Sequence, residues 1–244
     1  MGTQLCRPGQ RGAAMIGVVV PAHNEEALLP RALAALKLAA QHPALDAEPV
    51  AIVVVADSCC DQSAAIARER GVEVIETGMR NVGASRALGA AALIARGARW
   101  LAFTDADSKV HPDWLAAQLA LEADAVCGPV SVEDWSAHGA LSDALRLHFL
   151  ERYLHADGHR HIHAANLGVS AAAYLAAGGF LPLACSEDVA LVEALQRNGA
   201  RIAWSAAPRV VTSARTDARA RGGFGDTLLA YRDWLSGPAV AKAS

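Results

Sequence analysis

Short apolar runs that alternate with helical spacing of apolar residues constrain this chain more than any other feature. Such alternation indicates βαβ units, in which helices join parallel strands and cover the sheet. The sequence therefore predicts an α/β fold with a doubly wound, mostly parallel sheet flanked by helices. The expected strands are 16–20, 50–55, 72–75, 100–103 and 125–127, and the expected helices between them are 25–38, 61–70, 84–95 and 112–121.

The pattern becomes less regular in the second half of the chain, where a long amphipathic helix is expected at 137–155. No linker-like segment is evident, so we expect a single domain over 15–244. We expect residues 15–130 and residues 131–244 of this domain to line different sides of one binding site. Residues 1–14 lack the apolar core of a signal peptide and are expected to be a disordered start.

Charge and hydropathy exclude several classes of partner. The formal net charge of −3 over 244 residues gives no basic excess for binding nucleic acid. Although 53% of the residues are hydrophobic, no apolar stretch of about 18 residues escapes a charge or a turn signal, so no transmembrane helix is expected. Five cysteines without C-x-x-C spacing suit reduced thiols. We therefore expect a cytoplasmic enzyme that acts on a small molecule.

Two acids, Asp105 and Asp107, directly follow the strand expected at 100–103. The carboxyl edge of an α/β sheet is where ligands bind. Carboxylate oxygens suit Mg²⁺ or Mn²⁺, which complete their shells with phosphate oxygens and water. An Asx turn before the next helix is the structural alternative. The position after a strand favours a metal site that stabilises a diphosphate leaving group.

The two preceding strand ends also carry polar residues. Asn24 and Glu25 follow the first strand, and Asp57 and Asp61 follow the second. Helix capping and favourable helix-dipole interactions are sufficient structural explanations for each of these residues taken alone. Because carboxyl ends of parallel strands meet at one edge, we expect all three strand ends to face one crevice.

A glycine-containing turn at 78–85 places Arg86 near the start of a helix, where backbone N–H groups and a guanidinium can bind an anion. A turn capped by Ser85 is the alternative. Neither a G-x-G-x-x-G dinucleotide motif nor a Walker loop is present.

Further along, Ser186, Glu187 and Asp188 open a helical pattern. A cap at Ser186 with two acids in the first turn explains them structurally. A carboxylate here is also a candidate general base, provided that it reaches a substrate hydroxyl.

The histidine run 159–163 does not favour zinc, because no cysteine or acid completes a tetrahedral ligand set. A polar loop facing an acceptor is the preferred interpretation. Arg215, Arg219 and Arg221 either close over a phosphate or form a solvated basic segment, and the sequence leaves both open.

In combination, these motifs resemble the family 2 glycosyltransferases, which have the GT-A fold. Five motifs in family order are far more specific than any one of them. The resemblance spans about 16–204 and rests on the segments 19–26, 57–61, 81–87, 105–107 and 178–188.

The resemblance implies a metal-dependent transfer of a sugar from a nucleoside-diphosphate sugar, with UDP or GDP as the nucleotide, to an acceptor hydroxyl. Asp107, assisted by Asp105, would hold Mn²⁺ or Mg²⁺. Asp188 would be the catalytic base of an inverting transfer, supported by Glu187. The nucleotide would be bordered by Pro21, Ala22, Asn24, Glu25, Asp57, Arg86 and Asp105, and the acceptor side would include His161, His163 and Asn166.

Two features depart from the family pattern. Cys59 and Cys60 stand inside the second motif, where small polar residues are usual, and the Gln-x-x-Arg-Trp motif of sugar-polymerising members is absent. We therefore expect a single transfer. A nucleotidyltransferase would need a glycine-rich basic loop after the first strand, which this chain lacks. A degenerate nucleotide-sugar-binding protein is disfavoured by the presence of Glu187 and Asp188.

Overall fold

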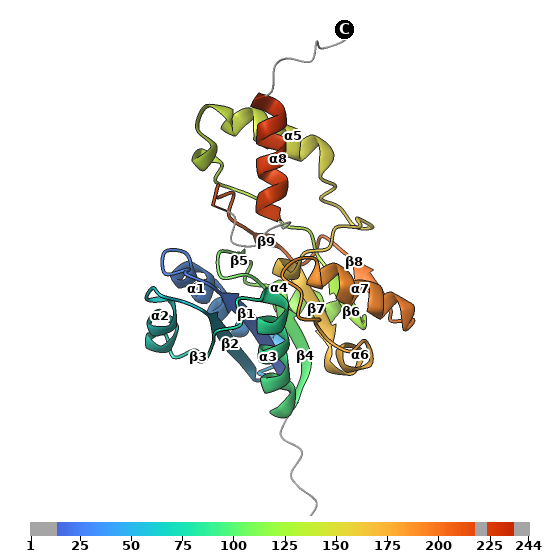
Figure 1. Ribbon diagram of the computed structural model, residues 1–244. Coiled ribbons are helices and arrows are strands. Elements are labelled where there is room, and N and C mark those ends of the chain that lie inside the picture. The colour runs from blue at the N-terminus through green and yellow to red at the C-terminus, as the bar shows by residue number, and fades with distance from the viewer. Residues whose placement is uncertain (1–13, 218–223, 237–244) are drawn as a thin grey trace, which may run out of the picture.

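The computed structural model describes residues 14–217 and 224–236 (Figure 1). The expected start at 1–14 falls outside these ranges except for Ala14. The strands are β1 Met15–Ala22, β2 Val50–Asp57, β3 Glu73–Thr77, β4 Ala98–Phe103, β5 Lys109–Val110, β6 Ala125–Cys127, β7 Leu167–Ser170, β8 Ile202–Trp204 and β9 Val210–Val211. The α-helices are α1 Leu29–Ala40, α2 Ser63–Glu69, α3 Val82–Ala95, α4 Trp114–Ala120, α5 Ser142–Arg152, α6 Ala171–Ala176, α7 Glu187–Arg197 and α8 Phe224–Ser236, and the 3₁₀ turns are η1 Pro43–Leu45, η2 Ser136–Leu141 and η3 Ala164–Asn166.

Within the described residues, the central sheet has seven strands in the order β3-β2-β1-β4-β7-β6-β8. Strands β3, β2, β1 and β4 are parallel, β7 is antiparallel to both β4 and β6, and β8 is parallel to β6. The predicted α/β fold with a mostly parallel sheet is confirmed. Strand β7 comes from the second half of the chain and lies between two strands of the first half, so both halves build one sheet.

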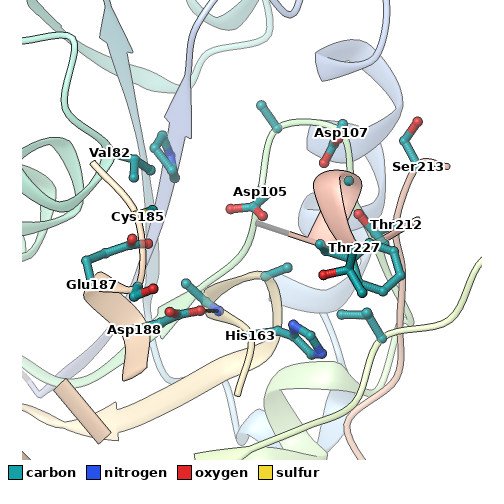
Figure 2. Close-up of a pocket in the computed structure, with 18 of the residues that line it drawn as sticks. Val82, Asp105, Asp107, His163, Cys185, Glu187, Asp188, Thr212, Ser213 and Thr227 are labelled. Atoms are coloured by element: carbon teal, nitrogen blue, oxygen red, sulfur yellow. Dashed lines mark hydrogen bonds between the residues drawn. The ribbon is translucent and has the colours of Figure 1, made fainter. Parts of the chain in front are cut away.

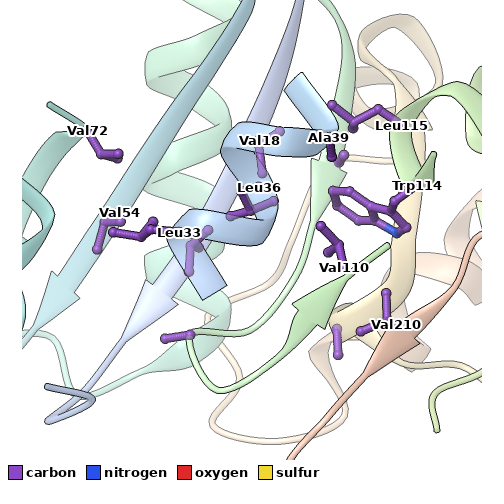
Figure 3. Packing of buried hydrophobic residues seen from close by; sticks show 14 of the residues in the cluster. Val18, Leu33, Leu36, Ala39, Val54, Val72, Val110, Trp114, Leu115 and Val210 are labelled. Atoms are coloured by element: carbon purple, nitrogen blue, oxygen red, sulfur yellow. The ribbon is translucent and has the colours of Figure 1, made fainter. Parts of the chain in front are cut away.

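The two faces of the sheet are covered by different helices. Successive strand residues point to opposite faces, so neighbouring residues of one strand pack against different helices. Val18 and Val54 pack with Leu36 of α1 on one face (Figure 3). Val19 and Phe103 lie on the other face, in a cluster with residues of α3, α6 and α7. A Cβ at position 89 would lie 2.6 Å from Cγ1 of Val19, so the glycine there lets α3 approach β1 closely.

Two helices begin later than the sequence pattern predicts. The helix expected at 137–155 is interrupted within η2 by a kink at Gly139, whose φ of 57° and ψ of −129° are not helical, and α5 begins only at Ser142. The helix expected at 25–38 begins at Leu29, and the backbone N–H groups of Glu25 and Glu26, which precede it, donate to Ser63 and Asp61.

The segments η2, α5 and α8 form a unit that we call the α5–α8 lobe. The lobe stands apart from the sheet and its flanking helices (Figure 1). Its small core contains Trp135, Leu145, Phe149 and Leu228, which are at most 6% exposed. In the described part of the chain, none of the helices is long and apolar enough to cross a membrane.

Candidate active site

A cavity of about 720 Å³ lies where the loops after β1, β2 and β4 meet the α5–α8 lobe. Asp105 and Asp107 enter it from the loop after β4, and Glu187 and Asp188 enter it from the start of α7. Figure 2 shows Glu187 and Asp188 on one side of the cavity, Asp105 in the middle, and His163 below Asp105. Acids that are far apart in the sequence therefore meet in one place.

Asp57 organises the loop before α3. Its carboxylate accepts hydrogen bonds from the backbone N–H groups of Arg80 and Asn81, both at 2.8 Å, and from the hydroxyls of Ser58 and Ser85, both at 3.0 Å. Burial favours the neutral acid, but these hydrogen bonds outweigh it and hold the pKa of Asp57 below its ordinary value. Asp57 thus lines the cavity as a fixed carboxylate.

The loops after β1 and β2 are joined by Asn24 and Cys59. The Asn24 side-chain oxygen accepts from the Cys60 N–H at 2.8 Å, and the Asn24 N–H donates to the Cys59 sulfur at 3.4 Å. The Cys59 thiol donates in turn to the carbonyl of Ala22 at 3.3 Å. Asn24 therefore joins the two loops next to the cavity and does not cap α1, whose N-cap is Leu28. Its expected contact with the nucleotide stays a prediction.

Arg86 is the buried cation of the site. It is 4% exposed and lies between two carboxylates, donating to Asp105 at 2.6 Å and also to Glu187. Its guanidinium carbon lies 5.9 Å from the centre of the Phe180 ring. Burial raises the pKa of Glu187, and the charge of Arg86 opposes this rise. Arg86 therefore links the loop after β4 to the first turn of α7.

Arg215 occupies the other end of the acidic cluster. Its two terminal nitrogens donate to the carboxylate of Glu25 at 2.8 and 2.6 Å, and one of them lies 3.0 Å from Oδ2 of Asp107. Of the three arginines considered for a phosphate clamp, Arg215 thus reaches the cavity. Arg219 and Arg221 lie outside the described residues.

Asp107 is the acid of the cavity whose pKa is strongly raised. Burial raises its pKa, the nearby carboxylate of Asp105 raises it further, and Arg215 opposes the rise, leaving a pKa of about 6. No group of three or more His, Cys, Asp or Glu side chains among the described residues is arranged to hold a metal ion. The carboxylate oxygens of Asp107 and Asp105 nevertheless fit Mg²⁺ or Mn²⁺, which need only one or two carboxylates beside phosphate and water.

Asp188 is held in place by backbone groups. Its Oδ2 accepts from the Ala164 N–H at 2.9 Å, and its Oδ1 accepts from the Val189 N–H at 2.8 Å. Ser186 occupies the N-cap position of α7, but its φ of 59° is left-handed and its side chain makes no cap hydrogen bond, in contrast to what the sequence predicts. The fixed carboxylate of Asp188 lines the cavity and can accept a proton there.

The three histidines of the run 159–163 form a stack on Tyr153. The ring centres of Tyr153 and His161 are 3.8 Å apart, and the planes differ by 7°. His161 and His163 line the cavity, as expected for the acceptor side. Burial lowers the pKa of His163 to about 4, so its ring is neutral at pH 7.

Asn166, expected at the acceptor side, does not line the cavity. It is fully buried, and its amide nitrogen donates to the carbonyls of Pro129 and Pro208, both at 2.8 Å. Its oxygen accepts from the Trp114 indole at 2.8 Å. These bonds tie η3 to the start of α4 and to the loops that follow β6 and β8. The expected acceptor contact of Asn166 stays a prediction.

The cavity brings together most of the residues expected from the sequence. It also has an aromatic side that sequence reasoning missed, formed by Phe149, Tyr153, Phe224 and Tyr231. The only signal for it was helical spacing within α5 and α8, which is also typical of core residues. The expected residues that line the cavity are Pro21, Ala22, Glu25, Asp57, Arg86, Asp105, Asp107, His161, His163, Glu187 and Asp188.

A mostly parallel sheet with an acidic cavity at its carboxyl edge is the architecture of the GT-A glycosyltransferases. The sequence profile described as Glycosyl transferase family 2 matches residues 17–145, more than half of the chain. The chain therefore belongs to glycosyl transferase family 2. Curated protein sequences give no significant match.

Solved structures share the fold at low sequence identity. TarS 1–349 of S. aureus has a TM-score of 0.56 and 16% identity over 82% of this chain, which spans 60% of that structure. The mannosyltransferase PcManGT of Pyrobaculum calidifontis, in complex with GDP-Man and Mn²⁺, has a TM-score of 0.62 and 16% identity over 88% of this chain and 63% of its own. Glucosyl-3-phosphoglycerate synthase of Mycobacterium tuberculosis, in complex with Mn²⁺, UDP-glucose and phosphoglyceric acid, has a TM-score of 0.51 and 19% identity over 80% of this chain and 72% of its own.

Proposed function

We propose that this chain transfers a sugar from a nucleoside-diphosphate sugar to an acceptor hydroxyl, with inversion at the anomeric carbon and with a divalent metal ion. The observation that carries the proposal is the meeting of Asp105 and Asp107 with Glu187 and Asp188 in one cavity. Family membership and the GT-A neighbours support it. The cytoplasmic location expected from the sequence stays a prediction.

The donor would lie along the loops after β1, β2 and β4, where Pro21, Ala22, Glu25 and Asp57 line the cavity. Asp107 would hold Mn²⁺ or Mg²⁺ with Asp105 beside it, and the ion would offset the charge that develops on the leaving diphosphate. Two neighbours were solved with Mn²⁺ and with UDP-glucose or GDP-Man, which supports a UDP or GDP sugar as the donor.

Asp188 would act as the general base. Its carboxylate takes the proton of the acceptor hydroxyl as the hydroxyl oxygen attacks the anomeric carbon from the side opposite the diphosphate. The backbone N–H of Ala164 fixes this carboxylate, so little reorganisation is needed at the moment of reaction. Arg86 keeps Glu187 paired, so that Glu187 supports the start of α7 next to the base.

The test is a thermal-shift panel of UDP, GDP and their sugar conjugates, each with Mn²⁺ and with EDTA. Ligands that bind the folded chain raise its melting temperature by mass action. We expect stabilisation by one nucleotide class that EDTA abolishes. No stabilisation by any nucleotide would contradict the proposal. Stabilisation without release of nucleoside diphosphate from any donor and acceptor pair would favour the degenerate binding protein.

A further inference from the structure

The side of the cavity that faces away from the donor loops is aromatic. Phe149 of α5 stacks with Tyr153, the residue that follows α5, with ring centres 4.5 Å apart, and Phe224 of α8 meets Phe149 edge-on at 5.8 Å. Tyr231 of α8 also lines the cavity. We call these four residues the aromatic wall. They come from the α5–α8 lobe and, in the case of Tyr153, from the residue that follows α5.

The wall offers little charge to a ligand. His161 and His163, which lie against Tyr153, are kept neutral by burial. Among the described residues, Arg152 is the one cation that the lobe contributes to the cavity lining, and it is exposed. On the other side of the same space, Arg86 and Arg215 are each paired with two carboxylates of the protein, so their charges are already neutralised.

We propose that the acceptor is an uncharged hydroxyl compound with an apolar or aromatic body, which packs on the aromatic wall and presents its hydroxyl to Asp188. This inference rests on the proposed sugar transfer. Cavities with aromatic lining and few polar groups bind ligands by burying apolar surface. Aromatic rings supply such surface at small conformational cost, because they have few rotatable bonds.

The transfer is balanced without a further reactant. The acceptor O–H bond breaks and its proton passes to the carboxylate of Asp188. The acceptor oxygen forms a bond to the anomeric carbon, and the bond from that carbon to the diphosphate breaks, leaving its electron pair on the diphosphate oxygen. The acceptor thus enters uncharged and leaves as an uncharged glycoside.

The test compares three probes that share a glucose ring: n-octyl β-D-glucoside below its micelle-forming concentration, methyl β-D-glucoside and glucose 6-phosphate. Saturation-transfer NMR and titration measure binding to the full chain with Mn²⁺ and the stabilising nucleoside diphosphate. We expect the octyl probe to bind about tenfold more tightly, or better, than the other two, because only its chain buries apolar surface. Equal or tighter binding of the methyl glucoside or the phosphate would overturn the proposal.

Two variants of α8 locate the binding. Tyr231 lines the cavity, whereas Trp234 is 64% exposed and does not line it. Tyr231→Ala should weaken binding of the octyl probe several-fold and leave the nucleotide-dependent melting shift unchanged, and Trp234→Ala should alter neither. Loss of octyl binding in Trp234→Ala with normal binding in Tyr231→Ala would place the probe on the outer surface and overturn the proposal.

A second measurement distinguishes an acceptor in a membrane from an acceptor in solution. Co-sedimentation with phosphatidylcholine vesicles supports a membrane lipid as acceptor, and octyl-glucoside binding without co-sedimentation supports a dissolved amphiphile. Both outcomes support the uncharged apolar class. If the octyl probe binds through Tyr231 while no nucleotide stabilises the chain, the sugar-transfer proposal fails and the apolar ligand site stands.

Discussion

The donor side of the cavity and the α5–α8 lobe are held together by different forces. On the donor side, Asp57 accepts four hydrogen bonds and Arg86 joins two carboxylates while almost fully buried. In the lobe, the contacts are aromatic, with Phe149 stacked on Tyr153 and meeting Trp135 at 5.5 Å. Hydrogen bonds fix direction and charge, whereas apolar packing is roughly non-directional.

This difference indicates a division of function, in which the two sides of the cavity bind chemically different ligands. A directional polar network suits a ligand whose charged groups have a fixed geometry, as a diphosphate does. A packed aromatic surface adapts to ligands of varied shape and selects mainly against charge. The following predictions test that division.

The largest effect expected on the donor side is the loss of turnover in Asp107→Asn. The substitution removes one carboxylate charge from the proposed metal site, so we expect turnover to fall about a hundredfold or more. Asp113→Asn is the matched control, because Asp113 pairs with Arg209 at the surface, and it should retain turnover within about twofold. Steady-state release of nucleoside diphosphate measures both. Equal turnover in the two variants would show that the acidic donor side is not the reaction centre.

The pH dependence of metal binding should follow Asp107. Its pKa is raised to about 6, so protons compete with the metal below that pH, and Mn²⁺ affinity should fall about tenfold per pH unit. Without metal, the folding stability changes with pH in the opposite direction. The raised pKa means that Asp107 adds stability to the fold below its ordinary pKa, and this contribution is lost as the pH rises through about 6. Electron paramagnetic resonance of free Mn²⁺ between about pH 5 and pH 7 checks the first point. An affinity that does not change over this range would contradict the prediction.

The lobe should open more readily than the sheet. Its core is the small cluster around Phe149, while β1 and β4 are buried between two helical layers. We expect amide hydrogens of α5 and α8 to exchange with an opening free energy lower by a few kcal/mol than those of β1 and β4. Native-state hydrogen exchange measures this difference. Equal protection would mean that the two regions unfold as one unit.

The smallest expected effect concerns Cys59, which joins the two donor loops. Cys59→Ser keeps a donor and an acceptor near Ala22 and Asn24, so it should cost less than about 1 kcal/mol of unfolding free energy. Cys59→Val leaves the Asn24 N–H without this partner and should cost about 1–3 kcal/mol. Urea denaturation of both variants decides the matter, and identical stabilities would show that the thiol does not link the loops.

The sequence could predict the donor side because its residues follow strand ends. Asp57 and Asp105 each end an apolar run, and the rule that parallel strands share one carboxyl edge brings them together. The bond between the Asn24 side chain and Cys60 could not be predicted, because nothing in the local pattern shows that the two loops meet there. The aromatic wall could not be predicted, since Phe149 and Tyr231 meet only through the tertiary packing of α5 and α8.

The measurement that tests the account most directly is the comparison of turnover and donor affinity in Asp188→Asn. An amide in place of the carboxylate cannot take the acceptor proton, so we expect turnover to fall about a hundredfold to ten-thousandfold. Affinity for the nucleotide with Mn²⁺ should stay within about twofold of the unmodified chain, because Asp188 lies beyond the proposed nucleotide site. Turnover that survives this substitution would contradict the assignment of Asp188 as the base.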